Sequence, residues 1–156
     1  MNTSNSLLLS ANQIYRRIVD KINALEPVAL LAARFYVGWA FFSSGLTKLN
    51  NWDSTLFLFE EEYHVPLLPY ELAAYLGTAA EIILPLLLMA GLTSRLSALG
   101  LFFVNIVAVI SLEDIAAAAY AQHVLWGMLL LQVVIFSGGR FAFDHMVKRQ
   151  LTQTQS

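Results

Sequence analysis

The 156-residue sequence has no cysteine and few charged residues. Without cysteine the chain has no disulfide, thiolate metal site or covalently attached haem. Charged residues make up 13% of the chain, against roughly a quarter in an ordinary soluble domain. The formal net charge is −2, so no basic surface for nucleic acid is indicated. These absences exclude a standard water-soluble globule and leave any redox chemistry to a bound cofactor or another protein.

Several catalytic and metal-binding patterns are also missing. The sequence contains no Gly-rich phosphate loop, no GxSxG and no HExxH. His64, His123 and His145 fall in different predicted segments, so no two of them bracket one haem iron. The acidic run 60–62 beside His64 offers ligands for a divalent cation, but such a run in a loop is usually solvated. We therefore predict no haem site, no thiolate site and no other metal site.

Apolar residues dominate the chain instead. They make up 58% of it, and the mean hydropathy is +0.62. Apolar runs of about 20 residues match helices that cross roughly 30 Å of hydrocarbon. We predict four spans at about 28–49, 67–90, 95–112 and 115–137. Short connections make neighbouring helices antiparallel, so the sequence predicts an all-α integral membrane four-helix up-down bundle, with residues 1–156 as a single domain.

The segment before the first span has its own pattern. Ile14, Ile18, Ile22 and Leu25 recur at helical spacing, and charged residues fill the opposite side. This pattern predicts an N-terminal amphipathic helix that lies on the membrane surface.

Basic residues near the predicted spans are distributed unevenly. Seven flank one end of the bundle and Lys48 alone flanks the other. The positive-inside rule predicts that both termini are cytoplasmic. The loop on the outer side carries aromatic residues that suit the headgroup layer, namely Trp52, Phe57, Phe59 and Tyr63.

Two ionisable residues lie well inside the predicted spans. Counting along ideal helices puts Arg34 and Glu81 at similar depths. Arg34 shares one face of its helix with Gly38, Phe41, Gly45 and Lys48, and glycines let another helix come close. We therefore predict an Arg34–Glu81 ion pair at the centre of the bundle, which leaves both a structural and a binding or proton-handling role open.

Three further polar residues are candidates for buried or ligand-binding roles. Arg95 is the next candidate partner for Glu81. Asn105 and His123 both fall in the outer half of the membrane by the same counting. For Asn105 an interhelical hydrogen bond and a ligand contact are the alternatives. His123 starts a helical stripe with Trp126 and is the better candidate for lining a cavity.

The same residues carry a family resemblance. Over residues 28 to about 112, the sequence resembles the DoxX family of small four-helix membrane proteins. The motifs that carry this resemblance are Arg34, Gly38, Ser44 to Lys48, Gly77 with Glu81, and Gly91 to Arg95. Three further stretches are similar to the HvfX-type members of that family, namely 62–69, 105–111 and 123–127. The HvfX-type members are encoded beside the maturation machinery of small copper-binding modified peptides (RiPPs, bufferin-like).

The resemblance implies a setting more than a reaction. It implies a multi-pass protein of the bacterial inner membrane that assists maturation or export of a copper-binding peptide, with lipid, maturation proteins and that peptide as partners. DoxX relatives are associated with quinone-linked chemistry, so a quinone is the implied ligand. A quinone needs an apolar slot with hydrogen-bond donors at its carbonyls. The candidate donors are Arg34, Lys48, Asn105 and His123, and the candidate walls are Tyr36, Trp39 and Phe41.

Other functions remain open at the level of sequence. A non-enzymatic scaffold with a structural ion pair is the main alternative. A small transporter is disfavoured because the chain shows no internal repeat, although a homo-oligomer would supply further helices. The sequence identifies no catalytic residue and does not decide whether the protein is an enzyme.

Overall fold

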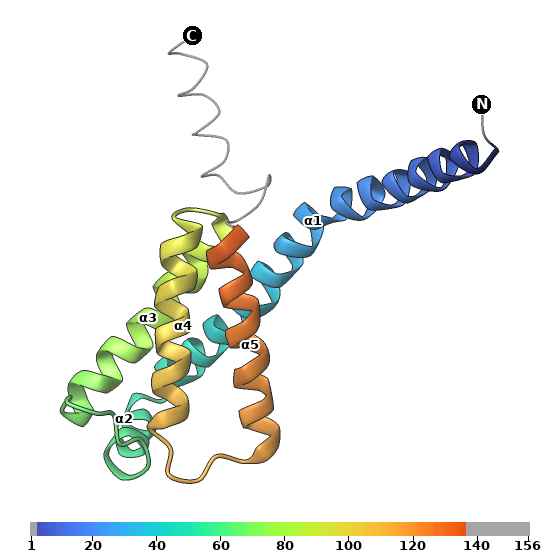
Figure 1. Cartoon of the computed structure of the whole chain (residues 1–156). Helices are drawn as coiled ribbons and strands as arrows, with labels where there is room; N and C mark the ends of the chain where they lie inside the picture. The colour runs from blue at the N-terminus through green and yellow to red at the C-terminus, as the bar shows by residue number, and fades with distance from the viewer. Residues whose placement is uncertain (1–2, 137–156) are drawn as a thin grey trace, which may run out of the picture.

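The chain folds as a bundle of helices. The computed structural model describes residues 3–136, with side chains described from residue 12 onward. This part contains five helices and an isolated bridge between Tyr63 and Leu112. The helices are α1 (Thr3–Asn50), α2 (Trp52–Glu61), α3 (Tyr70–Ala90), α4 (Ser94–Ile110) and α5 (Ala117–Phe136) (Figure 1). The predicted all-α membrane bundle is confirmed.

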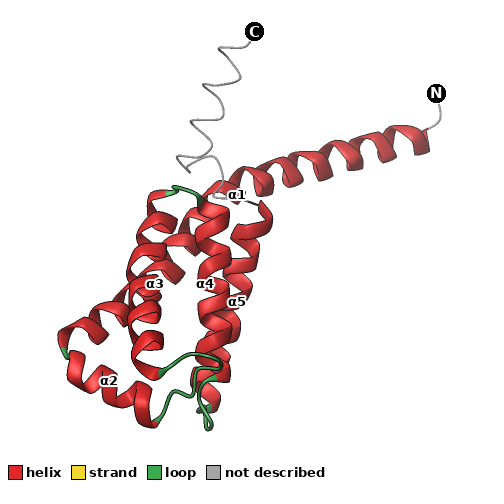
Figure 2. Ribbon diagram, turned by 90° about the vertical axis from the view of Figure 1, so that its left-hand side faces the viewer, coloured by secondary structure: helices red, strands yellow, loops and turns green. Residues whose placement is uncertain are grey.

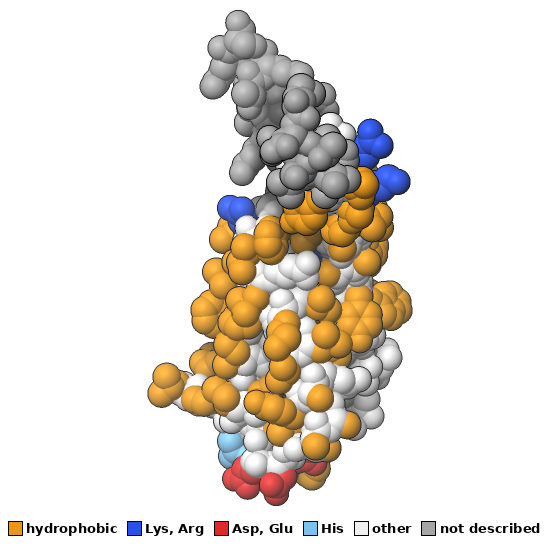
Figure 3. All heavy atoms as spheres, turned by 45° about the vertical axis from the view of Figure 1, so that its right-hand side comes forward, with side chains coloured by type: hydrophobic (Ala, Val, Ile, Leu, Met, Phe, Trp, Pro, Cys, Tyr) orange, Lys and Arg blue, Asp and Glu red, His pale blue; other side chains and the backbone are white. Residues whose placement is uncertain are grey.

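Three of the helices are long and apolar enough to cross a membrane. They are α1 from residue 12 to residue 50, α3 and α5. The fourth, α4, is equally apolar but has 17 residues, which lies at the lower limit for a spanning helix. Figure 3 shows apolar side chains over the middle of one face of the molecule, with Lys and Arg at one end and Asp and Glu at the other. This distribution suits a protein whose middle faces lipid.

The four long helices form a ring. α1 packs against α3 and α5, and α4 also packs against α3 and α5. The turn at Gly91 lies at the end of the bundle where α1 enters, whereas α2 and the 111–116 connection lie at the opposite end (Figure 2). The main core lies between the helices and contains Val37, Phe41, Leu88, Ala98, Leu101, Leu130 and Val133.

The N-terminal amphipathic segment differs from the expected separate helix. It is continuous with the first span, so that α1 is a single helix of 48 residues that extends away from the bundle (Figure 1). Pro27 lies inside α1 without ending it. Ile14, Ile18, Ile22 and Leu25 are all more than half exposed. The apolar stripe therefore remains available to a membrane surface.

Helix α2 was not expected from the sequence. Asn51 caps its start, because the Oδ1 atom of Asn51 accepts a hydrogen bond from the Ser54 amide at 3.1 Å. Phe59 is buried and forms a small second core with Ala73 and Ala74 of α3. Phe59 therefore packs inside the protein, whereas Phe57 is exposed and free to contact headgroups. Burial of Phe59 holds α2 across the end of the bundle.

Two glycines set how α1 and α3 approach. A Cβ atom added to Gly38 would lie 2.7 Å from Met89 Cγ, and one added to Gly45 would lie 2.8 Å from Ile82 Cδ1 and 3.1 Å from Glu81 Cβ. Such close contacts need residues without side chains. The two positions fix the antiparallel register, with Gly45 opposite Glu81 and Gly38 opposite Met89.

We expect Gly45→Val to destabilise the protein by about 1–3 kcal/mol, because the added methyl groups overpack the α1–α3 contact. Gly77→Ala is the control, since its Cβ atom would meet only Phe59, at 3.6 Å or more. The melting temperatures of the purified variants in detergent measure the effect. Wild-type melting of Gly45→Val would contradict the close approach.

Candidate functional site: a membrane cavity with an ion pair

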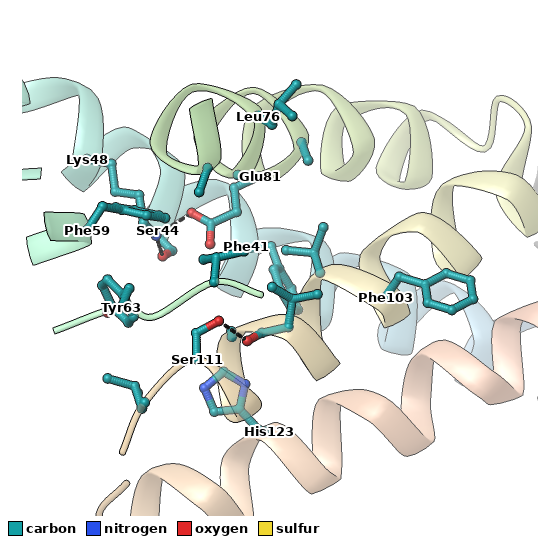
Figure 4. A pocket seen from close by; sticks show the side chains of 18 of the residues that line it. Phe41, Ser44, Lys48, Phe59, Tyr63, Leu76, Glu81, Phe103, Ser111 and His123 are labelled. Atoms are coloured by element: carbon teal, nitrogen blue, oxygen red, sulfur yellow. Dashed lines mark hydrogen bonds and ion pairs between the residues drawn. The ribbon is translucent and has the colours of Figure 1, made fainter. Parts of the chain in front are cut away.

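The bundle contains a cavity of about 580 Å³ that is partly open to the outside. Its lining comes from α1, α3, α4 and α5 and from α2 with the segment that follows it. Most of the lining is apolar, and Figure 4 shows Lys48 and Glu81 on one side of it and His123 on another. The polar or partly polar lining residues are Ser44, Lys48, Tyr63, Glu81, Ser111, His123 and Trp126.

Lys48 and Glu81 form an ion pair in the cavity wall. The Nζ atom of Lys48 donates to Glu81 Oε2 at 2.5 Å and to Ser44 Oγ at 2.9 Å. The side chains of Lys48 and Glu81 are only 19% and 10% exposed. A charged pair is costly to hold in such surroundings unless it is well bonded, and intramembrane ionisable groups usually mark functional sites. The pair is therefore the main candidate for the functional centre.

The predicted Arg34–Glu81 pair is wrong. Arg34 is buried, but its Nε atom donates to the carbonyl oxygen of Leu88 at 2.9 Å and its Nη2 atom to that of Met89 at 2.8 Å. These carbonyls belong to the last turn of α3, which ends at Gly91 with a φ of 74°. Carbonyls at a helix C-terminus carry partial negative charge that a cation stabilises. Arg34 therefore caps α3 at a distance of two turns from Glu81.

Arg95, the alternative partner for Glu81, also donates to a backbone carbonyl. Its Nη2 atom donates to the carbonyl oxygen of Ile135 in α5 at 3.2 Å. This position also excludes Arg95 as the partner of Glu81. Neither arginine is among the residues that line the cavity.

His123 and Asn105 bind each other across α4 and α5. The Nδ2 atom of Asn105 donates to the backbone oxygen of His123 at 2.9 Å, and His123 Nδ1 lies 2.8 Å from Asn105 Oδ1. Because that oxygen accepts, Nδ1 carries the proton and a neutral ring presents Nε2 as an acceptor. His123 lines the cavity. Asn105 therefore orients His123 instead of lining the cavity itself.

Trp126 supplies a polar group that the sequence analysis did not single out for binding. Its Nε1 atom is buried and has no hydrogen-bond partner within residues 12–136. The ring packs against Phe41 and against the edge of His123, with centroid distances of 5.6 and 5.0 Å. Buried donors without a partner are rare in native proteins and need an explanation such as a ligand or water. The signal in the sequence was the position of Trp126 one turn after His123.

Tyr63 completes the polar lining at the α2 end. It follows α2, and its ring lies 5.0 Å from that of Phe59. Burial, followed by the negative charges of Glu81 and Glu62, raises the pKa of the Tyr63 phenol above its ordinary value of 10.0. The phenol therefore stays protonated at neutral pH and presents a hydroxyl group.

The aromatic residues predicted to form the walls of the ligand slot differ in whether they line the cavity. Phe41 lines the cavity, whereas Tyr36 and Trp39 are 53% and 61% exposed on the outside of α1. Across the described residues, no three His, Asp or Glu side chains are grouped so as to hold a metal ion. His145 lies outside the described residues.

Comparison with known proteins now gives the family. A model of the DoxX family matches residues 29–114. The chain belongs to the DoxX family. An uncharacterized protein of Haemophilus influenzae is 29% identical over 131 residues, which cover 78% of this chain and 85% of the relative. No solved structure matches the chain significantly. The DoxX match includes Lys48 and Glu81 and ends before His123.

We expect Glu81→Gln alone to lower stability by a few kcal/mol, because it leaves the Lys48 ammonium unpaired in a buried position. Adding Lys48→Met should restore part of the loss, so that the double variant is more stable than the sum of the single losses predicts. Melting temperatures and yields of folded protein from membranes measure this coupling.

Arg34→Gln provides the control for the same cycle. The carbonyl partners of Arg34 begin seven residues beyond Glu81 on α3, a distance of about 10 Å along the helix. The loss of stability caused by Arg34→Gln should therefore add to the loss caused by Glu81→Gln. The Lys48–Glu81 pairing would be contradicted if the stability losses of the Lys48 and Glu81 variants were additive. It would also be contradicted if the losses of the Glu81 and Arg34 variants were strongly coupled.

Proposed function

We propose that this DoxX protein binds a lipophilic carbonyl compound, of which a quinone is the best candidate, and assists the maturation or export of a copper-binding peptide at the bacterial inner membrane. The observation that carries the proposal is the apolar cavity with an ion pair in its wall. Ligand sites commonly have volumes of about 300–1,000 Å³ and combine apolar walls with a few polar groups. The cavity of about 580 Å³ lies within that range.

The polar groups suit a ligand with carbonyl or hydroxyl oxygens. Lys48 and Trp126 both line the cavity; the Lys48 ammonium is a donor, and the buried Trp126 indole N–H is a second donor that has no partner within residues 12–136. The neutral His123 ring offers an acceptor to a ligand hydroxyl. Phe41 and Phe103 also line the cavity and supply aromatic surface. A quinone has both the flat apolar ring and the paired oxygens that this arrangement would bind.

The rim of the cavity favours entry from lipid. Leu76 of α3 and Phe103 of α4 line the cavity, yet they are 52% and 59% exposed. Val107, one turn after Phe103, is also exposed. Apolar side chains at an opening between membrane helices favour a ligand dissolved in the bilayer over one dissolved in water. This argues for a lipophilic ligand.

The copper-peptide setting rests on the HvfX-type stretches. In the structure, all three contribute lining residues to the same cavity: Tyr63 from the first, Ser111 from the second, and His123 with Trp126 from the third. Because the similar stretches meet at one cavity, they favour a ligand that this protein shares with the HvfX-type proteins. We therefore assign the protein to the HvfX-type members as part of the proposal.

The proposed orientation places α2 outside the cytoplasm. Basic side chains gather at the end where α1 enters, and acidic ones gather at the α2 end (Figure 3). Positively charged flanks favour the cytoplasmic side. The cavity and its ion pair would then lie in the outer half of the membrane.

We expect purified protein in mild detergent to retain about one quinone per chain, since the cavity is the size of one ligand. Ala108→Phe should abolish retention, because Ala108 lines the cavity and a larger side chain fills it. Leu99→Phe is the matched control, as it adds aromatic volume on the exposed side of the same helix. Organic extraction and chromatography measure the quinone.

The same pair of variants tests the biological setting. In cells, Ala108→Phe should lower copper tolerance as much as removal of the gene, whereas Leu99→Phe should not. Folded protein without quinone in every mild detergent, or equal retention in both variants, would reject the ligand and favour the scaffold.

A further inference from the structure

A second, smaller cavity adjoins the ligand cavity. Its volume is about 240 Å³, and it lies between α1 and α2. The two cavities share four lining residues, namely Ser44, Lys48, Phe59 and Tyr63. Glu81 lines only the larger cavity. The Lys48–Glu81 pair therefore lies at the boundary between two spaces.

Five of the seven residues that line the small cavity carry a polar group in the side chain. Ser44, Thr47, Thr55 and Tyr63 contribute hydroxyl groups, and Lys48 contributes its ammonium group. A cavity has room for a water molecule when its volume exceeds about 10–15 Å³, and a buried water needs two to four polar partners. The small cavity meets both conditions, and residues with polar groups make up a larger share of its lining than of the lining of the larger cavity.

The position of the small cavity places it near bulk water. It lies at the α2 end of the bundle, where acidic side chains gather (Figures 1 and 3). Thr47, in its lining, is exposed. Lys48 lies one residue further along α1 and three residues before the cap of α2 at Asn51. The distance from water to the ion pair is therefore short.

We propose that the small cavity is an aqueous vestibule through which the Lys48–Glu81 pair exchanges protons with the medium on the α2 side of the membrane. In the exchange, a hydrated proton protonates the Glu81 carboxylate and leaves water, and the reverse step restores the carboxylate. No electron moves. The vestibule gives a ligand in the larger cavity a proton path that does not cross lipid.

The charged and titratable groups around Glu81 are consistent with this role. Lys48 faces it from α1, Tyr63 from the segment after α2, and His123 from α5 across the ligand cavity. The α4 residues in the cavity lining are apolar: Phe103, Val104, Val107 and Ala108. Protons would therefore reach Glu81 from the α1–α2 side. Delivery to a ligand rests on the proposed function, whereas the access of water does not.

Water access is tested by cysteine substitution, for which the cysteine-free chain gives no background. Ser44→Cys lies in the shared wall, and Ala80→Cys lines only the larger cavity. A membrane-impermeant cationic methanethiosulfonate should react with Ser44→Cys from the α2 side at least about tenfold faster than with Ala80→Cys, because only a hydrated thiol ionises readily. Neutral N-ethylmaleimide should label both folded variants.

Thr55→Cys, which is buried and lines only the small cavity, replaces Ser44→Cys if the latter does not fold. Equal labelling rates for the cysteines in the two cavities, or labelling from the opposite side of the membrane only, would overturn the proposal of an aqueous vestibule. This experiment needs no ligand, so its failure is distinct from a failure to find quinone.

Proton exchange is tested by infrared spectroscopy in oriented proteoliposomes. An acid pulse on the α2 side should produce a carboxylic acid band that is absent from Glu81→Gln and shifts in heavy water. Thr47→Leu fills the small cavity and should slow the appearance of this band by about tenfold or more, since its hydroxyl bonds only to the backbone oxygen of Ser43 and protons need a hydrated path. An unchanged rate in Thr47→Leu, or a band that responds only from the opposite side, would overturn the proposal.

Discussion

The Lys48–Glu81 ion pair is the interaction on which the rest of the structure depends. A lone charge in hydrocarbon is expensive, so each partner needs the other at short range. Gly45 lets α3 approach α1 closely enough for the contact, and Ser44 provides a second acceptor for Lys48. Burial of Phe59 then holds α2 beside the pair. The contacts that satisfy the charges thus also form the common wall of two cavities.

The sequence predicted which face of α1 is buried but not what that face contacts. Arg34, Gly38, Phe41 and Gly45 all lie inside the bundle, as the helical periodicity and the glycines indicated. Counting residues from the middle of each span assumed that the helix midpoints lie at one depth. The glycine contacts set a different register, which brings Lys48 to Glu81 and Arg34 to the end of α3. Hydropathy contains no information on that register.

Parts of the cavity were also beyond sequence reasoning. Counting along the spans puts Asn105 and His123 in the outer half of the membrane but does not pair them, whereas in the structure they bind each other. Helix α2 has only 10 residues, too few for a membrane span, so the hydropathy pattern predicts a connecting loop there. Its packing creates the second cavity and buries Phe59. Trp126 drew no attention because an aromatic residue in a span normally packs, and only the structure shows that its N–H has no partner within residues 12–136.

The pairing of Lys48 with Glu81 in a bilayer tests the account most directly. Solid-state NMR on lipid-reconstituted protein measures the dipolar coupling between ¹⁵Nζ of lysine and ¹³Cδ of glutamate. We expect strong dephasing of a single lysine signal that disappears in Glu81→Gln and changes when quinone is added. Dephasing of the Glu81 carboxylate by an arginine guanidinium, or by no cation, would contradict the account.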